Sequence, residues 1–234
     1  MLEVKDLVLF RGGKEVLHGV DLVARPGEIT ALVGANGAGK SSLVMSIAGE
    51  LPSASGRIRV DGQALRGLRP EMVRRHGVAT VPEGHRVLGG LSVLDNLRVA
   101  ANHRPGAEVA RAIDEVLDIL PELKAKLADP GRSLSGGQKQ MVAVAQALLA
   151  QPRYLIVDEL SLGLAPLVVR RLADLLQAVA ARGTGVLLIE QFTTMALGMA
   201  AQANVLVRGR MAWTGAAEEL KAHPEILERS YLGA

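Results

Sequence analysis

The chain has 234 residues, enough for one domain with a sizeable hydrophobic core, and it contains no cysteine. Disulfides, thiol chemistry and thiolate metal sites are therefore excluded. The net charge is +3 with both signs mixed along the chain, so no basic block indicates a nucleic-acid partner. The apolar runs are too short for a membrane span, and the N-terminal segment lacks the pattern of a signal peptide.

The N-terminal part of the chain is predicted to form short strands around a glycine-rich loop. Partial alternation of apolar and polar residues predicts strands at 2–9, 16–23 and 57–62. The run ITALVG, residues 29–34, predicts a buried strand that enters the loop directly. Residues 41–51 follow the loop with the apolar spacing of a helix.

The rest of the chain alternates between helices and strands. Helices are expected at 92–128, 139–150 and about 166–182, with two short ones at the C-terminal end. Strands are expected at 154–159 and 185–191. Residues 203–215 predict a hairpin that turns at Arg208 and Gly209. This alternation predicts an α/β fold with a mostly parallel core sheet covered on both faces, and the early strands predict an antiparallel addition.

The loop after the first buried strand, GANGAGKS at Gly34–Ser41, fits the pattern G-x-x-x-x-G-K-[ST]. Its glycines would let the backbone wrap around phosphates with the N–H groups turned inward. Lys40 would reach the β- and γ-phosphates as a point charge, and the Ser41 hydroxyl would bind Mg²⁺. Because a strand precedes the loop and a helix follows it, nucleotide binding is a better interpretation than a glycine turn with a surface lysine.

A second apolar strand, YLIVDE, ends in two carboxylates. It would deliver Asp158 to the C-terminal edge of the sheet, where ligands lie in open α/β sheets. Asp158 would hold Mg²⁺ through water, and Glu159 would orient or deprotonate the attacking water. A lone DE would fit a solvated acidic turn, but beside a P-loop in the same chain it indicates nucleotide hydrolysis.

The segment LSGGQ, residues 134–138, is a second candidate anion site. Glycines that open a helix present bare backbone N–H groups, which bind anions. Taken alone, the segment is better interpreted as a glycine-rich helix cap.

Together, the P-loop, LSGGQ and the strand ending in DE resemble the ATP-binding subunit of an ABC transporter over essentially the whole chain. The resemblance implies the ABC ATPase version of the P-loop NTPase fold. It implies a single domain at 1–234, with a helical subdomain at about 85–150 inserted between the P-loop and the DE strand. In this family LSGGQ is the signature segment. Two subunits pack head to tail, and the signature of one subunit closes over the ATP that is bound by the other. Residues Ser135, Gly136, Gly137 and Gln138 would act in trans in this way.

The resemblance also assigns roles to individual positions. Catalysis is assigned to Glu159, Lys40, Gln191 and Glu83. ATP binding is assigned to Phe10, Gly34, Ala35, Asn36, Gly37, Ala38, Gly39, Lys40, Ser41 and Ser42. Binding of Mg²⁺ is assigned to Ser41, Asp158 and Glu83. Phe10 follows the first strand, where the family places an aromatic ring, often Tyr, against adenine; it fits equally well as an ordinary core residue.

Several positions depart from the residues that are usual in the family. Glu83 stands in place of a Gln, Ala165 of an Asp, Gln191 of a His and Leu160 of a Pro. These departures fit either a degenerate ATPase or a subfamily. The segments VPEG, SLGLAP, the strand end EQ and the C-terminal YLG resemble one of the two ATPase subunits of branched-chain amino acid importers. The subfamily interpretation is therefore favoured, although Leu160 departs even from that subgroup.

Two of the departures have a chemical consequence. Gln191 can donate a hydrogen bond to phosphate but cannot carry a proton or a charge near neutral pH. Glu83 adds a negative charge beside Mg²⁺, which tightens the metal but repels phosphate. We therefore expect slower hydrolysis than at a site with a His. The five histidines show no metal-ligand spacing, so all of them, His85 included, are expected to be structural or at the surface.

The resemblance implies an ATPase that energises uptake of branched-chain or other hydrophobic amino acids. Related uptake systems for urea, amides or aromatic acids, and a weakly catalytic regulatory subunit, are the alternatives. A non-transport ABC ATPase is disfavoured, because the chain has neither a long coiled coil nor a second ATPase domain. The implied partners are a second, different ABC ATPase subunit, two permeases contacted around Val87–Leu91, and an extracytoplasmic solute-binding protein. The implied location is the cytoplasmic face of the inner or plasma membrane.

Overall fold

A computed structural model of the chain describes residues 1–84, 86–102, 104–191 and 193–232. His85 and His103, both expected to be structural or at the surface, lie outside these ranges. The other three histidines each contact a nearby polar side chain, His18 with Glu15, His76 with Gln63 and His223 with Glu225. In the described part of the chain, no helix is both long and apolar enough to cross a membrane.

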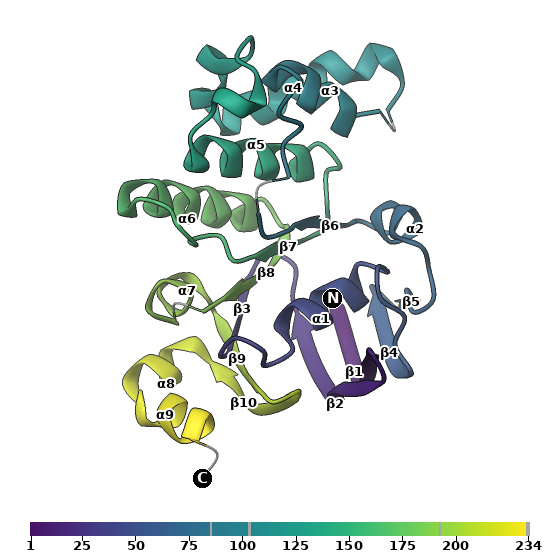
Figure 1. The fold of residues 1–234 in the computed structure, drawn as a ribbon, viewed down its shortest axis with the longest axis vertical. Helices are drawn as coiled ribbons and strands as arrows, with labels where there is room; N and C mark the ends of the chain where they lie inside the picture. The colour runs from purple at the N-terminus through teal and green to yellow at the C-terminus, as the bar shows by residue number, and fades with distance from the viewer. Residues whose placement is uncertain (85, 103, 192, 233–234) are drawn as a thin grey trace.

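A four-stranded antiparallel sheet is built from the N-terminal part of the chain (Figure 1). Its strands are β1 (Leu2–Arg11), β2 (Lys14–Ala24), β4 (Ser55–Val60) and β5 (Gln63–Ala64), in the order β2-β1-β4-β5. The pairs β1–β2, β1–β4 and β4–β5 all run antiparallel. The antiparallel addition that the sequence predicts is therefore confirmed.

A six-stranded, mostly parallel sheet forms the centre of the molecule, as predicted. Its strands are β3 (Ile29–Val33), β6 (Val78–Val81), β7 (Tyr154–Asp158), β8 (Gly185–Glu190), β9 (Gln202–Val207) and β10 (Arg210–Ala216). The order is β10-β9-β3-β8-β7-β6, and only the β9–β10 pair is antiparallel. That hairpin turns at Arg208 and Gly209, whose φ values of 46° and 75° match the two-residue turn that suits a twisted hairpin.

Helices surround this sheet. They are α1 (Lys40–Ile47), α2 (Pro70–Arg75), α3 (Val93–Ala100), α4 (Gly106–Ile119), α5 (Gly136–Leu148), α6 (Pro166–Ala181), α7 (Thr193–Met199), α8 (Ala217–Ala222) and α9 (Glu225–Leu232). Two short 3₁₀ helices, η1 (Pro121–Lys126) and η2 (Gly131–Ser133), precede α5. Figure 1 shows α3, α4 and α5 gathered at one end of the molecule, beyond the β6 edge of the sheet.

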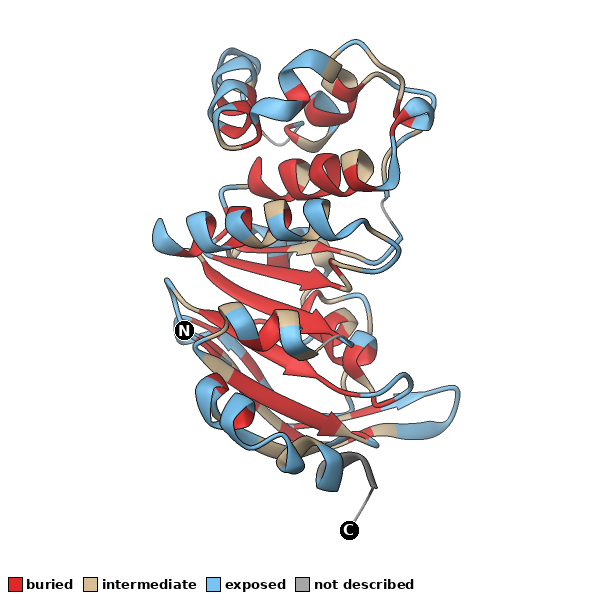
Figure 2. Ribbon diagram, turned by 90° about the vertical axis from the view of Figure 1, so that its left-hand side faces the viewer, coloured by how far each residue is buried: buried red, intermediate tan, exposed pale blue. Residues whose placement is uncertain are grey.

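Five strands of the six-stranded sheet, β3, β6, β7, β8 and β9, are mostly buried, as Figure 2 shows, whereas edge strand β10 is exposed or half-buried along its length. Alternate residues of one strand join different hydrophobic clusters: Leu155 and Val157 pack with α3–α6, whereas Tyr154 and Ile156 pack with α1 and the antiparallel sheet. A parallel sheet covered on both faces needs continuous apolar strands, because neither face meets water. The apolar runs of β3, β7 and β8 meet this requirement.

Helix boundaries differ from the sequence prediction in three places. The helix expected at 41–51 spans Lys40–Ile47. The single helical stretch expected at 92–128 is three helices, because Pro105 caps the start of α4 and Pro121 opens η1. The helix expected at 139–150 begins at Gly136, three residues earlier. The two glycines of LSGGQ therefore lie in the first turn of α5.

Candidate nucleotide site

The P-loop joins the end of β3 to the start of α1. A side chain at Gly34 would collide with the carbonyl oxygen of Leu206 on β9, and Gly37 and Gly39 have φ values of 79° and 111°. Glycine is therefore required at these positions for close approach and for a left-handed backbone. The N–H of Gly209, in the β9–β10 turn, donates to the carbonyl of Ala38 at 2.8 Å, so that turn supports the loop.

Lys40 lies at the first position of α1 and is 5% exposed. Its Nζ donates hydrogen bonds to the carbonyl oxygens of Gly34 at 2.8 Å and Ala35 at 3.2 Å. The ammonium therefore lies inside the loop, where an anion cradled by the loop would meet it directly. This is the position that the sequence predicts for a phosphate-binding lysine.

Asp158 is the last residue of β7 and is 6% exposed. Its Oδ1 has no hydrogen-bond partner among the residues that the structure describes. Burial, with smaller contributions from the negative charges of Glu159 and Glu83, raises the pKa of the carboxyl to about 6, and a hydrogen bond from Ser41 and the charge of Lys40 oppose the rise. A buried carboxylate oxygen without a partner is costly unless a cation meets it, so the residues present fit Mg²⁺.

The described residues include no cluster of three or more His, Asp, Glu or Cys side chains that could hold a metal alone. A magnesium ion here would have to take its remaining oxygen ligands from phosphates and water. That is the usual coordination of Mg²⁺ at phosphate sites, where the protein supplies only one or two ligands.

A cavity of about 500 Å³ opens beside these residues. It is lined by Arg11, Val16, Asn36, Gly37, Gly39, Lys40, Ser41, Ser42, Glu83, Glu159, Leu162 and Gln191. Glu83 follows β6, Glu159 follows β7 and Gln191 follows β8, so three neighbouring strands deliver their polar ends to one place. The C-terminal edge of a parallel sheet is where ligands bind in open α/β folds.

Some of the expected ATP-binding residues lie elsewhere. Phe10 does not line the cavity and is 51% exposed, so the alternative that it is a core residue is wrong. The neighbouring Arg11 and Val16 line the cavity instead, which the sequence prediction missed. Gly34, Ala35 and Ala38 complete the P-loop outside the lining of this cavity.

Glu159 is half-buried and has a φ of 51°, in the left-handed region. Its own N–H donates to the carbonyl of Ile189 on β8 at 3.0 Å. A residue other than glycine rarely adopts this backbone conformation, and such residues cluster at functional sites.

The LSGGQ segment forms the start of α5, away from the cavity of its own chain. The Ser135 Oγ accepts from the N–H of Gln138 at 3.3 Å, and the Gln138 side chain accepts from the N–H of Ser135 at 2.9 Å. This capping box satisfies two backbone donors, which accounts for the earlier start of the helix. Within one chain, these residues cap a helix and do not line the nucleotide cavity.

A further polar contact lies behind the cavity and has no counterpart in the sequence prediction. Glu190, the last residue of β8, is 1% exposed. Its two carboxylate oxygens accept hydrogen bonds from the Ser161 N–H at 3.1 Å and the Ser161 hydroxyl at 2.9 Å. Burial raises the pKa of the Glu190 carboxyl, and these hydrogen bonds oppose the shift. A charged residue at the end of an otherwise apolar strand was the available signal.

This fold, with a P-loop between a central strand and a helix and a carboxylate pair on a nearby strand, defines the chain as a P-loop nucleotide hydrolase. A family model described as ABC transporter matches residues 17–161. The chain belongs to the ABC transporter family, and it is an ATPase of that family.

Two relatives match over their full length. BraG of Pseudomonas aeruginosa, a high-affinity branched-chain amino acid transport ATP-binding protein, is 36% identical over 233 residues, which cover 100% of both chains. LivF of Archaeoglobus fulgidus, a probable branched-chain amino acid transport ATP-binding protein, is also 36% identical over 233 residues, covering 98% of each. A solved ATP-binding subunit of an ABC transporter is similar with a TM-score of 0.85 and 31% identity, covering 100% of this chain and 98% of that one.

Proposed function

We propose that this chain is the ATPase of an ABC importer that takes up branched-chain or other hydrophobic amino acids. The identity of 36% with BraG along the whole length carries this proposal. VPEG, SLGLAP and the strand end EQ, which are the segments that resemble the subfamily, include cavity residues Glu83, Leu162 and Gln191 and thus belong to the site itself. The departures at Glu83 and Gln191 are then features of the subfamily, in which the chain hydrolyses ATP more slowly than with a His at the γ-phosphate.

In this proposal the cavity holds ATP with Mg²⁺. The P-loop N–H groups and Lys40 bind the phosphates, and Ser41, Asp158 and Glu83 hold the metal, which supplies charge neutralisation at the transferred phosphoryl group. Glu159 orients or deprotonates the attacking water, and Gln191 donates a hydrogen bond to the γ-phosphate. Phe10 or its neighbours Arg11 and Val16 contact the adenine ring. Asp158 supports the metal assignment through its buried oxygen without a partner among the described residues.

The proposed ATPase works as a head-to-tail dimer. Ser135, Gly136, Gly137 and Gln138 open α5 outside the cavity of their own chain, so they are available to the ATP of a partner subunit. The N-terminal end of α5 carries a partial positive charge that favours a phosphate. The partner is a second, related ABC ATPase subunit. Closure around two ATP molecules would then move the attached permeases between their inward- and outward-facing states.

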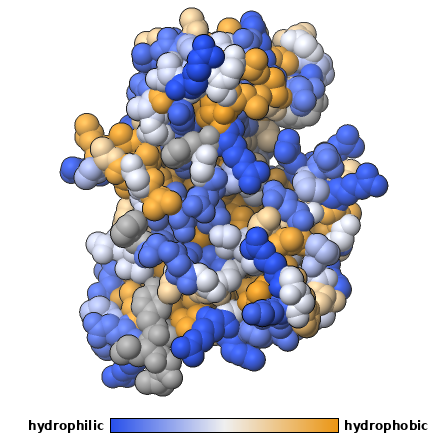
Figure 3. Space-filling model, viewed as in Figure 1, coloured by the Kyte–Doolittle hydropathy of each residue, from blue (hydrophilic) through white to orange (hydrophobic). Residues whose placement is uncertain are grey.

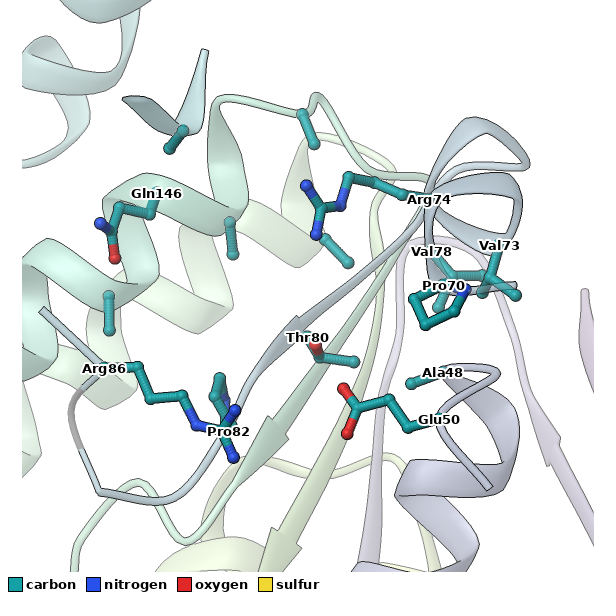
Figure 4. A pocket seen from close by; sticks show the side chains of 15 residues that line it. Ala48, Glu50, Pro70, Val73, Arg74, Val78, Thr80, Pro82, Arg86 and Gln146 are labelled. Atoms are coloured by element: carbon teal, nitrogen blue, oxygen red, sulfur yellow. The ribbon is translucent and has the colours of Figure 1, made fainter. Parts of the chain in front are cut away.

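A second groove is proposed as the contact with the permeases (Figure 4). It has a volume of about 180 Å³ and lies where α2, α5 and the end of β6 meet. In this proposal the groove lies where the helical subdomain at about 85–150 joins the rest of the chain. Glu50, Arg74 and Arg86 are exposed and line it together with Gln146. On the face in Figure 3, hydrophobic side chains also gather over the helical end of the molecule. Such a mixed surface suits a transient protein contact and would hold the chain at the cytoplasmic face of the membrane.

The test is ATP hydrolysis by the chain assembled with its permeases in lipid vesicles. A solute-binding protein loaded with leucine should stimulate hydrolysis, and Glu159→Gln should abolish it, whereas Glu218→Gln on α8 should leave it unchanged. Stimulation only by binding proteins for urea, amides or aromatic acids would point to a related uptake system. Full hydrolysis in the Glu159→Gln assembly would show that a partner ATPase does the work and that this chain is regulatory.

A further inference from the structure

The buried carboxylate of Glu190 has no part in the proposed hydrolysis, yet it lies directly behind the residues that carry it. It ends β8, and the rest of that strand, GVLLI, is apolar and buried. An ionised carboxylate is strongly disfavoured in such a place unless donors meet both of its oxygens. Ser161 donates to each oxygen, with its N–H at 3.1 Å and its hydroxyl at 2.9 Å, and the N–H of Leu160 adds a weaker contact. The two donors of one residue thus match the two oxygens of the other.

These hydrogen bonds cross between two segments that flank the cavity. Ser161 lies two residues after Glu159 and immediately before Leu162, and both Glu159 and Leu162 line the cavity. Glu190 immediately precedes Gln191, which lines the same cavity. The contact therefore fixes the end of β8 against the turn that follows β7. Each partner has a cavity residue next to it in the sequence, Leu162 after Ser161 and Gln191 after Glu190.

The turn needs such an anchor because its backbone is strained. Glu159 has a φ of 51°, a conformation that persists outside glycine only where surrounding contacts hold it. One contact lies on the N-terminal side of this strained φ angle, where the Glu159 N–H donates to the carbonyl of Ile189 at 3.0 Å. The second contact lies on the C-terminal side of Glu159, where Ser161 donates two hydrogen bonds to the Glu190 carboxylate. Two successive residues of β8 therefore hold the backbone on both sides of the Glu159 side chain.

We propose that Glu190 is a positioning residue, which through Ser161 fixes the turn that aims the Glu159 carboxylate into the nucleotide cavity. This inference rests on the proposed role of Glu159 in hydrolysis. Displacing a catalytic group by about 1 Å lowers turnover by about a hundredfold in other enzymes. The contribution of Glu190 would therefore appear in kcat, since among the described residues its carboxylate makes no hydrogen bond to the P-loop that binds ATP.

The test compares three variants of the full chain in the assembled transporter. Glu190→Leu removes both acceptors and should lower kcat by about ten- to a hundredfold, with the KM for ATP changed less than about threefold. Glu190→Gln can still accept from the Ser161 N–H and can donate to the Ser161 hydroxyl, so it should keep kcat within about threefold. Ser161→Ala keeps the backbone hydrogen bond and should lie between these two. Adding Ser161→Ala to Glu190→Leu should cause no further loss, because both changes remove one interaction.

A matched control separates positioning from stability. Asn204 is a buried polar residue on β9, two strands away in the same sheet, and it accepts from Thr214 at 3.0 Å. Asn204→Leu should lower the melting temperature but leave kcat unchanged. The ATP affinity of each isolated chain shows whether it has folded. If Glu190→Leu binds no ATP, the kcat values of Glu190→Gln and Ser161→Ala test the positioning role instead.

The inference is overturned if Glu190→Leu keeps the kcat of the unchanged protein. It is also overturned if Glu190→Gln is as slow as Glu190→Leu, since geometry would then not be what the carboxylate provides. Glu159→Gln is measured beside them. If that variant hydrolyses ATP normally, the proposed role of Glu159 is wrong. If it is inactive while Glu190→Leu is not, only the positioning role of Glu190 is wrong.

Discussion

Val168 of α6 packs directly against the backbone of Gly137 in the first turn of α5. A Cβ built on Gly137 would lie 2.6 Å from the Val168 Cγ1, closer than real carbon atoms approach. The second glycine of LSGGQ is therefore needed within its own chain, whatever it does for a partner. The contact fixes the start of α5, and so the signature, against the helix that follows the DE strand.

This contact predicts the effect of Gly137→Ala. The added methyl group must push α5 and α6 apart, at a cost of about 1–3 kcal/mol in the free energy of unfolding. Gly106→Ala, at the start of α4, is the matched control, since a Cβ there meets nothing within 4 Å. Thermal unfolding of the two variants should show a clear loss for Gly137→Ala and little change for Gly106→Ala. Equal melting temperatures would mean that the helices yield freely.

The parts of the site that could be predicted are those fixed by local sequence. The P-loop and the strand ending at Asp158 and Glu159 each need only a strand, a turn and a fixed spacing, and all of these lie within a few residues. The contact of Glu190 with Ser161 spans 29 residues, so no local pattern reveals that the carboxylate has a partner. Long-range pairing of that kind follows from the sheet order, which the sequence leaves open.

Other differences have equally specific causes. Helices α2 and α7 have six and seven residues, too short to show a helical period. Along β1, Leu7 and Leu9 are buried, so strand alternation turns Phe10 to the exposed side. Arg11 at the end of β1 and Val16 on β2 line the cavity instead.

The raised pKa of Asp158 predicts a pH-dependent cost in the nucleotide-free protein. The carboxyl has a pKa of about 6 when folded, against an ordinary value of 3.8. Between these values the folded state holds a proton that the unfolded chain has released, so the contribution of Asp158 to stability falls as pH rises. Above about pH 7 the cost should reach roughly 1–3 kcal/mol.

Asp158→Asn should remove this cost, so without Mg²⁺ and nucleotide the variant should be more stable than the unchanged protein near neutral pH. The advantage should shrink as pH falls through about 6 towards about 4. Chemical denaturation of both proteins across this range measures it. The paired carboxyls of Asp21 and Asp61, whose pKa values are lowered, weaken both proteins equally in acid and cancel in the difference. A difference in stability that does not change with pH would contradict the assignment.

Gln191→His tests whether this site is slow because it lacks an ionisable group at the γ-phosphate position. Gln191 lines the cavity at the end of β8, where a histidine could carry a charge or a proton that an amide cannot. We expect kcat for ATP hydrolysis to rise by a fewfold, about 2–10 times, with little change in KM. Gln177→His, at an exposed position of α6, is a control for the added imidazole. An unchanged or lower rate in Gln191→His would show that the amide suits this site.

The separation of LSGGQ from its own cavity predicts how the chain assembles. Glu159→Gln should block hydrolysis and trap any closed dimer, so the mass in solution of this variant, with and without Mg-ATP, reports whether the signature can serve a second copy. An ATP-dependent dimer would show the signature acting in trans between identical chains. Lys40→Ala in the same background should abolish that dimer, because the buried ammonium inside the P-loop is the phosphate contact. A monomer that still binds ATP would mean that only a different subunit completes the site, as expected for an importer with two related ATPases. A monomer that binds no ATP would contradict the nucleotide site itself.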